Sequence, residues 1–167
     1  SEGPGGHVLF TDTRGVRVET DGGVLAEVLD RIAEAHPAAI PLADVAGDTA
    51  VGRAIARLAL SGVVSLCTEP PPVTPVVPER PATSALARCQ AAQGMPTIAT
   101  LAHTSIGLAE AQTVQLLTLL DGTRDVVALT RELAQFTGET ETEVAEWLPD
   151  ALAALARNGF VAARTAS

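Results

Sequence analysis

Two cysteines and three histidines are the side chains of this 167-residue sequence that could serve catalysis or metal binding. Cys67 and Cys89 lack the short spacing of metal ligands, and His7, His36 and His103 are scattered along the chain. The two thiols could form a disulfide if the compartment allowed it. Isolated cysteines are more often buried and inert, so we expect two ordinary buried thiols and no metal site.

Nucleophilic catalysis needs a Ser, Cys or Asp beside a histidine that a third group orients. The sequence offers Cys89 with His103, and His36 with Asp44. Their spacing brings neither pair together, and a loop or surface position is the expected state of these histidines. We therefore predict no catalytic residue, while a small enzyme that uses Cys89 or His103 remains an alternative.

Two glycine-rich segments are candidates for binding a nucleotide or another anion. Gly3-Pro4-Gly5-Gly6 precedes every predicted strand and contains a proline, so we interpret it as a frayed terminus. Asp21-Gly22-Gly23 precedes a predicted helix and could present backbone amides to an anion, but a plain turn is favoured. We predict no cofactor-binding residue.

One short pattern occurs twice, in residues 55–64 and 152–161. In each copy an Ala/Leu-rich helix meets one glycine, Gly62 or Gly159, where a left-handed helix end is favoured, and then continues into a β-branched or aromatic strand. A corner of this kind ends a winged-helix unit. The duplication predicts a helix-rich α+β fold with short hairpins, made of two tandem winged-helix-like domains.

The first predicted domain covers residues 1–68. It contains a hairpin, a helix that starts near Val24 and stops at His36-Pro37, and a short segment that Pro41 begins. A further helix ends at Gly62, before a predicted closing strand over residues 63–67.

Residues 69–83 form a predicted linker between the domains. Six of the eleven prolines fall in this segment. Proline excludes helix and favours extended polyproline geometry, so we expect a stiff connection.

The second predicted domain covers residues 84–167 and repeats the order of the first. We expect a helix over 84–93, strand-like runs at 97–101 and 105–108, and helices over 109–120, 125–136 and 141–157. The spacing of Thr140 and Glu143 predicts a capping box at the start of the last helix. Pro149 should kink the last helix or divide it after Leu148.

The charge balance excludes two classes of partner. All 11 basic residues are arginine, against 20 acidic residues, and the net charge is −9. Residues 1–68 and 84–167 each contain nine acidic residues and five arginines. An acidic surface repels phosphate backbones and anionic lipids, so we predict neither a nucleic acid nor a membrane as partner.

Arginines on the third helix of the first domain could still bind DNA, as in many winged helices. Arg53 and Arg57 lie one turn apart on one face. The equivalent helix of the second domain carries four acidic residues between 141 and 150, which would oppose a phosphate groove. A winged-helix DNA-binding transcription regulator is therefore the alternative function.

Protein contact is the favoured function, because the planar guanidinium pairs with carboxylates through two hydrogen bonds. Arg53, Arg57 and Arg124 are the predicted partner-binding residues. Arg53 and Arg57 could instead be solvated or paired with nearby acids. Arg124 could instead fix its own turn by pairing with Asp121 or Asp125.

The chain has no apolar run long enough to span a membrane and no signal segment at its start, so a cytoplasmic location is expected. Because the sequence begins with Ser1 and not with Met, we expect a piece of a longer protein.

Three segments resemble the C-terminal region of bacterial class I methyltransferases that carry a regulatory domain. They are residues 80–88, residues 90–94 and, above all, Leu119-Leu120-Asp121-Gly122-Thr123-Arg124-Asp125. That group includes protein-lysine methyltransferases. The first half is similar to the end of the regulatory region and the second half to the terminal domain.

The resemblance implies a non-catalytic regulatory or substrate-docking module of a methyltransferase that depends on S-adenosylmethionine. The glycine motif of the family's catalytic domain has no match here, so no catalytic or cofactor-binding residue is carried over. The cofactor would belong to a catalytic domain outside this sequence. The implied partners are that domain of the same polypeptide, a protein substrate, and a second copy in a homo-oligomer.

Overall fold

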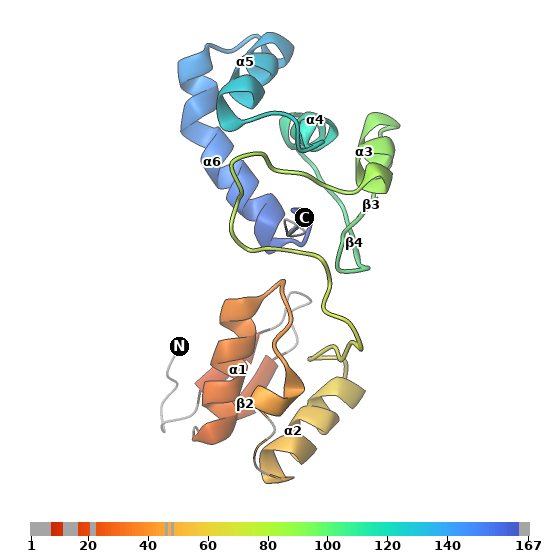
Figure 1. Cartoon of the computed structure of the whole chain (residues 1–167), viewed down its shortest axis with the longest axis vertical. Helices are drawn as coiled ribbons and strands as arrows, with labels where there is room; N and C mark the ends of the chain where they lie inside the picture. The colour runs from red at the N-terminus through yellow and green to blue at the C-terminus, as the bar shows by residue number, and fades with distance from the viewer. Residues whose placement is uncertain (1–7, 12–16, 21–22, 46, 48, 164–167) are drawn as a thin grey trace. The chain divides into compact units, whose positions relative to one another are not determined.

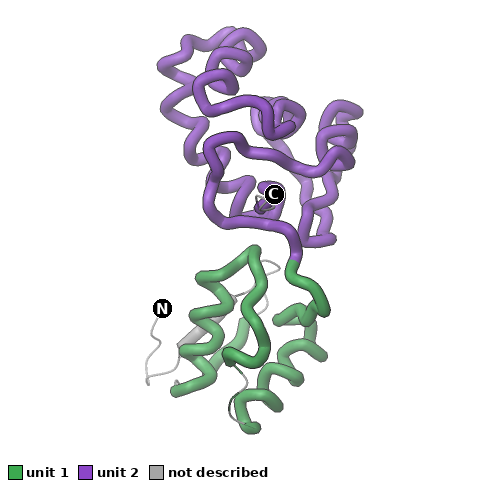
Figure 2. The backbone as a smooth tube through the Cα atoms, viewed as in Figure 1, with its two compact units in different colours: residues 1–70 green, residues 71–167 purple. Residues whose placement is uncertain are grey.

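The computed structural model describes residues 8–11, 17–20, 23–45, 47 and 49–163. The chain divides into two compact units, residues 1–70 and 71–167 (Figure 2). None of the helices in the described ranges is long and apolar enough to cross a membrane.

The first unit is a hairpin followed by two helices (Figure 1). Strands β1 (Val8–Thr11) and β2 (Arg17–Thr20) pair antiparallel, with Val8 opposite Thr20, as the sequence predicts. Helix α1 (Val24–Ala35), a 3-10 turn (Leu42–Asp44) and helix α2 (Thr49–Leu60) follow. A small aliphatic cluster holds this unit together, formed by Val28, Val45, Val51 and Ile55.

The predicted closing strand over residues 63–67 is wrong, because the structure assigns no strand there. The backbone N–H groups of Val63 and Val64 both donate to the carbonyl of Leu58, at 2.9 and 3.3 Å. These donors therefore complete the end of α2 and are not free to pair with a neighbouring strand.

The duplicated helix end is confirmed as one backbone motif made twice. Gly62 and Gly159 both adopt the left-handed conformation, with φ of 74° and 76°. The N–H of Val63 donates to Leu58 at 2.9 Å, and the N–H of Phe160 donates to Leu155 at 3.0 Å. The two copies then diverge, because Phe160 is fully buried while Val63 is only half-buried.

Within residues 71–163, the second unit contains four helices and one short hairpin (Figure 1). Its elements are α3 (Ala85–Ala92), β3 (Ile98–Ala99), β4 (Ser105–Ile106), α4 (Ala111–Leu119), α5 (Val126–Thr137) and α6 (Glu141–Arg157). Each lies close to its predicted range, and strands β3 and β4 pair antiparallel. The capping box of Thr140 and Glu143 at the start of α6 is confirmed.

The division after Leu148, one of the two outcomes expected at Pro149, is wrong, since α6 runs continuously from Glu141 to Arg157. A kink at Pro149 stays a prediction. A proline inside a helix removes one backbone hydrogen bond and costs about 3 kcal/mol. Leu148 and Leu152 on either side of it are almost completely buried in the core. Burial of these side chains offsets the lost hydrogen bond and keeps the helix whole.

The segment predicted as a linker belongs, from Pro71 onward, to the second unit, and we call residues 71–83 the strap. Its first part pairs with the chain that follows α6. Thr74 N–H donates to the carbonyl of Val161 at 3.1 Å, and Ala163 N–H donates to the carbonyl of Pro72 at 3.0 Å.

The end of the strap lies between two other backbone segments. The carbonyl of Ala82 accepts from Ala162 N–H at 2.8 Å on one side. On the other, Thr83 N–H donates to Leu120, and Gly122 N–H donates to the carbonyl of Pro81 at 3.2 Å. Proline lacks an N–H but keeps a full carbonyl acceptor, so a proline-rich segment can still be bound through its backbone.

Truncation of the side chain that follows the glycine should lower the free energy of unfolding by different amounts in the two copies of the helix end. Phe160→Ala removes a fully buried ring and should lower the free energy of unfolding of the second unit by about 3–5 kcal/mol. Val63→Ala, at the equivalent position of the first copy, is the matched control. Denaturant unfolding followed by the fluorescence of Trp147, the single tryptophan of the chain, reports on the second unit. Equal effects of the two changes on this transition would contradict the account.

Candidate functional site

The turn between α4 and α5 holds Arg124 by two charged hydrogen bonds. Its Nη1 donates to Asp121 Oδ2 at 2.5 Å, and its Nε donates to Glu132 Oε1 at 2.8 Å. Asp125 instead caps α5, accepting from Ala128 N–H at 2.8 Å. The geometry therefore shows Arg124 in the local pairing that was the alternative to partner contact.

Asp121 is the acceptor at the centre of this turn. Its Oδ1 accepts from the hydroxyl of Thr123 at 2.6 Å and from the Thr123 N–H at 2.9 Å. These two hydrogen bonds, with a smaller contribution from Arg124, lower the pKa of Asp121 from 3.8 to about 2 against the opposing effect of desolvation. Hydrogen bonds to Glu132 and Asp121 in turn raise the pKa of Arg124.

The same turn binds the strap. Gly122 has φ of 83°, and a Cβ at this position would lie 3.2 Å from the Cβ of Ala82. Arg80 Nη1 donates to the carbonyl of Thr123 at 3.0 Å. The turn at residues 121–124, which carries the family resemblance, thus has a structural role: it binds residues 80–82 of the strap.

Arg53 and Arg57 lie exposed on α2, in the first unit, whereas Arg124 is in the second. Across the described ranges the structure records no ion pair for either of them. Their role in partner binding stays a prediction.

The residues considered for nucleophilic chemistry are not assembled into a site. Cys67 and Cys89 are free and exposed, so the expected burial of both thiols is wrong. Ala87 and Ala91 are the buried residues of α3, and Cys89 between them therefore faces outward. His36 and His103 are exposed as expected, and the Asp21-Gly22 pair and His7 lie outside the described residues.

In the part of the chain that the structure describes, no group of three potential ligands could hold a metal ion. Nor does any recorded hydrogen bond join Cys89 to His103, or His36 to Asp44, among these residues.

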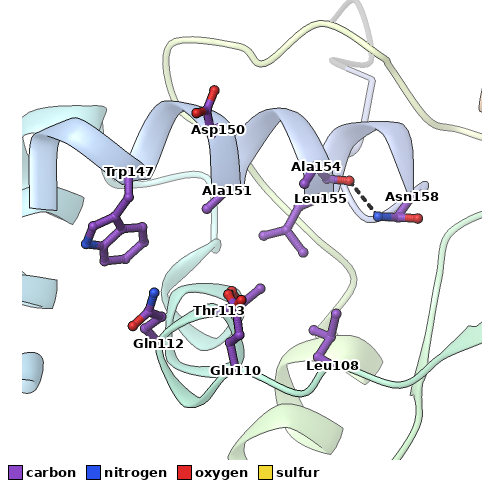
Figure 3. Close-up of a pocket in the computed structure, with 10 residues that line it drawn as sticks. All are labelled: Leu108, Glu110, Gln112, Thr113, Trp147, Asp150, Ala151, Ala154, Leu155 and Asn158. Carbon is purple, nitrogen blue, oxygen red and sulfur yellow. Dashed lines mark hydrogen bonds between the residues drawn. The ribbon is translucent and has the colours of Figure 1, made fainter.

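A pocket of about 380 Å³ lies between the start of α4 and one face of α6 (Figure 3). Trp147, Ala151 and Leu155 follow one another at four-residue spacing, which places them on the same side of α6. Leu108 and Glu110 come from the segment that leads into α4, and Gln112 and Thr113 from its first turn.

The lining has one aromatic and one aliphatic end. In Figure 3, Gln112 lies across from the Trp147 ring at one end, and Leu108 lies across from Leu155 at the other. The carboxylate of Glu110 stands between them, next to Thr113, whose hydroxyl donates to its Oε2 at 3.1 Å.

Two hydrogen bonds fix the α6 side of the pocket. Trp147 Nε1 donates to Glu139 Oε2 at 3.1 Å, and Asn158 Nδ2 donates to the carbonyl of Ala154 at 2.9 Å (Figure 3). Asp150 lies at the rim, and its carboxylate points away from α4 in this view.

Sequence reasoning did not identify this pocket. The available signal was Trp147, the single tryptophan of a chain with few aromatic residues, placed on a helix face one residue before the fully buried Leu148. The partners from the start of α4 could not be found without the helix packing.

Asp121→Asn should lower the free energy of unfolding by about 1–2 kcal/mol at pH 7. Because folding lowers the pKa of this carboxyl, its contribution is fully present above pH 4 and is lost as the pH falls toward 2. The stability difference between wild type and variant, measured by denaturant titration, should shrink over that interval. Asp150→Asn is the control and should change stability by under about 0.5 kcal/mol. If Asp121→Asn lowered the free energy of unfolding by the same amount at pH 7 and at pH 2, stabilisation by the ionised Asp121 carboxylate would be contradicted.

Residues 79–146 match the family model described as the C-terminal winged helix domain of PKMT. No curated protein matches the chain. Two solved structures share its fold: PKMT2 from Rickettsia typhi in complex with AdoHcy, with a TM-score of 0.67, and PKMT2 from the same organism, with a TM-score of 0.64.

Both structures are 18% identical in sequence to this chain, and the match covers 86% of it. The chain spans 35% of the length of those PKMT2 chains. The helix-rich α+β class and the winged helix of the second unit are thereby confirmed. As its sequence indicates, the chain is similar to the C-terminal region of protein-lysine methyltransferases, and its residues 79–146 match the model of their terminal winged helix domain.

Proposed function

We propose that this chain is the non-catalytic C-terminal module of a protein methyltransferase that depends on S-adenosylmethionine, and that it docks the protein substrate. The match of residues 79–146 to the PKMT winged helix domain carries the proposal. The shared fold over 86% of the chain with PKMT2 supports it.

The residues described here do not fit S-adenosylmethionine. Two strands lead through a glycine toward a helix, β2 through Gly23 and β4 through Gly107. Both strands belong to two-stranded antiparallel hairpins. Nucleotide sites of the glycine-rich type instead form at the carboxyl edge of a parallel sheet. The cofactor would therefore be held by a catalytic domain of the same polypeptide, which is the first partner of this module.

A DNA-binding regulator is the weaker alternative. The family model and the similar structures are those of methyltransferases. The four acidic residues of α6 that oppose a phosphate backbone are also exposed, namely Glu141, Glu143, Glu146 and Asp150.

Removal of residues 1–167 from the parent methyltransferase tests the proposal. Transfer of labelled methyl groups to the protein substrate should fall at least tenfold in kcat/KM, about 1.4 kcal/mol or more of lost substrate binding. The affinity for S-adenosylmethionine, measured by calorimetry, should change by less than about twofold, because none of the cofactor contacts would be removed. The mass of the truncated protein in solution shows in addition whether the module holds a homo-oligomer.

Phe160→Ala in the intact parent is the matched variant, because it destabilises the second unit without shortening the chain. Its KM for the protein substrate should rise in the temperature range where the second unit unfolds. Unchanged methylation by both the truncated protein and the unfolded variant would contradict a docking role.

A further inference from the structure

We propose that the pocket between α4 and α6 binds a lysine or arginine side chain of a bound polypeptide. The inference rests on the proposed function in one respect, namely that this polypeptide is the methyltransferase substrate. The pocket residues themselves define the chemistry of the side chain that fits.

The aliphatic part of the pocket suits a long, unbranched stem. Leu108 lines one end, over the almost fully buried Leu155, and the small side chains of Ala151 and Ala154 leave room along α6 (Figure 3). Lysine and arginine carry such a stem and gain free energy when it packs on apolar surface while the charged head stays in polar contact.

The polar part of the pocket suits a positive charge. None of the lining residues is basic, and Glu110 places its carboxylate between the two ends of the pocket. Thr113 donates to Oε2 of this carboxylate, and the described residues provide no recorded donor to Oε1. Because Glu110 is exposed, a guanidinium or ammonium group can reach Oε1 and donate a charged hydrogen bond to it in place of solvent.

The tryptophan adds a second contact for a cation. Glu139 accepts the indole N–H of Trp147, which holds this half-buried ring at the edge of the pocket. A cation near a tryptophan face gains about 0.5–1 kcal/mol at a partly exposed site. The acidic pocket and the net charge of −9 disfavour an anionic side chain at the same place.

The test is a titration of the 167-residue chain with a short peptide of alternating glycine and lysine, followed by the fluorescence of Trp147. The matched peptide carries acetyl-lysine, which keeps the stem and removes the charge. We expect the lysine peptide to change the fluorescence with saturation, and the acetyl-lysine peptide to bind at least about tenfold more weakly.

Glu110→Gln should weaken binding of the lysine peptide about threefold to tenfold. Glu146→Gln removes the same charge from α6 outside the pocket and should weaken it less than about twofold. Glu110 is exposed and its side chain makes no cap hydrogen bond, so folding should be retained and circular dichroism checks this. Equal losses in both variants would show attraction to the net charge alone and would overturn the inference.

The parent methyltransferase separates this inference from the proposed function. If the lysine peptide binds in the pocket but Glu110→Gln leaves the substrate KM of the parent unchanged, the cation-binding pocket stands and its use for the methylation substrate is overturned. If methylation depends on the module but neither lysine nor arginine peptides perturb Trp147, docking stands and the pocket inference is overturned.

Discussion

The structure of the second unit depends on the corner where α6 ends. Gly159 takes up the left-handed conformation there, and Phe160 and Val161 enter the core completely buried. Backbone groups of residues 161–163 then pair with the strap at both Pro72 and Ala82. Because the strap is bound in turn by the Asp121 turn, the corner fixes the C-terminal end of α6 to the start of α5.

The same local motif has different consequences in the two units because tertiary packing differs. The two helix ends share three equivalent backbone hydrogen bonds, but Val63 is only half-buried and no strand follows it. The core of the first unit consists of few aliphatic residues, whereas that of the second includes many fully buried leucines. A repeat in sequence therefore indicates equal local structure and does not by itself indicate equal stability.

Local signals predicted the helices well. The capping box at Thr140, which the sequence predicts, starts α6. The structure adds two caps that were not predicted: Ser84 caps α3 through the N–H of Ala87, and Gly138 ends α5 in the left-handed conformation. The strap could not be predicted in the same way, because proline composition reports what a segment cannot form and not which donors reach its carbonyls. Pro149 does not divide α6, because burial of its neighbours outweighs the missing hydrogen bond. The pocket joins residues from α4 and α6, whose packing no local pattern encodes.

We propose that this chain recognises the protein substrate of a methyltransferase, with the pocket between α4 and α6 as the contact site. Hydrogen–deuterium exchange of the parent enzyme with and without its protein substrate tests that assignment most directly. Substrate should slow exchange in the first turn of α4 and along α6 from Trp147 to Asn158. Protection confined to the catalytic domain, with unchanged exchange in both helices, would contradict it.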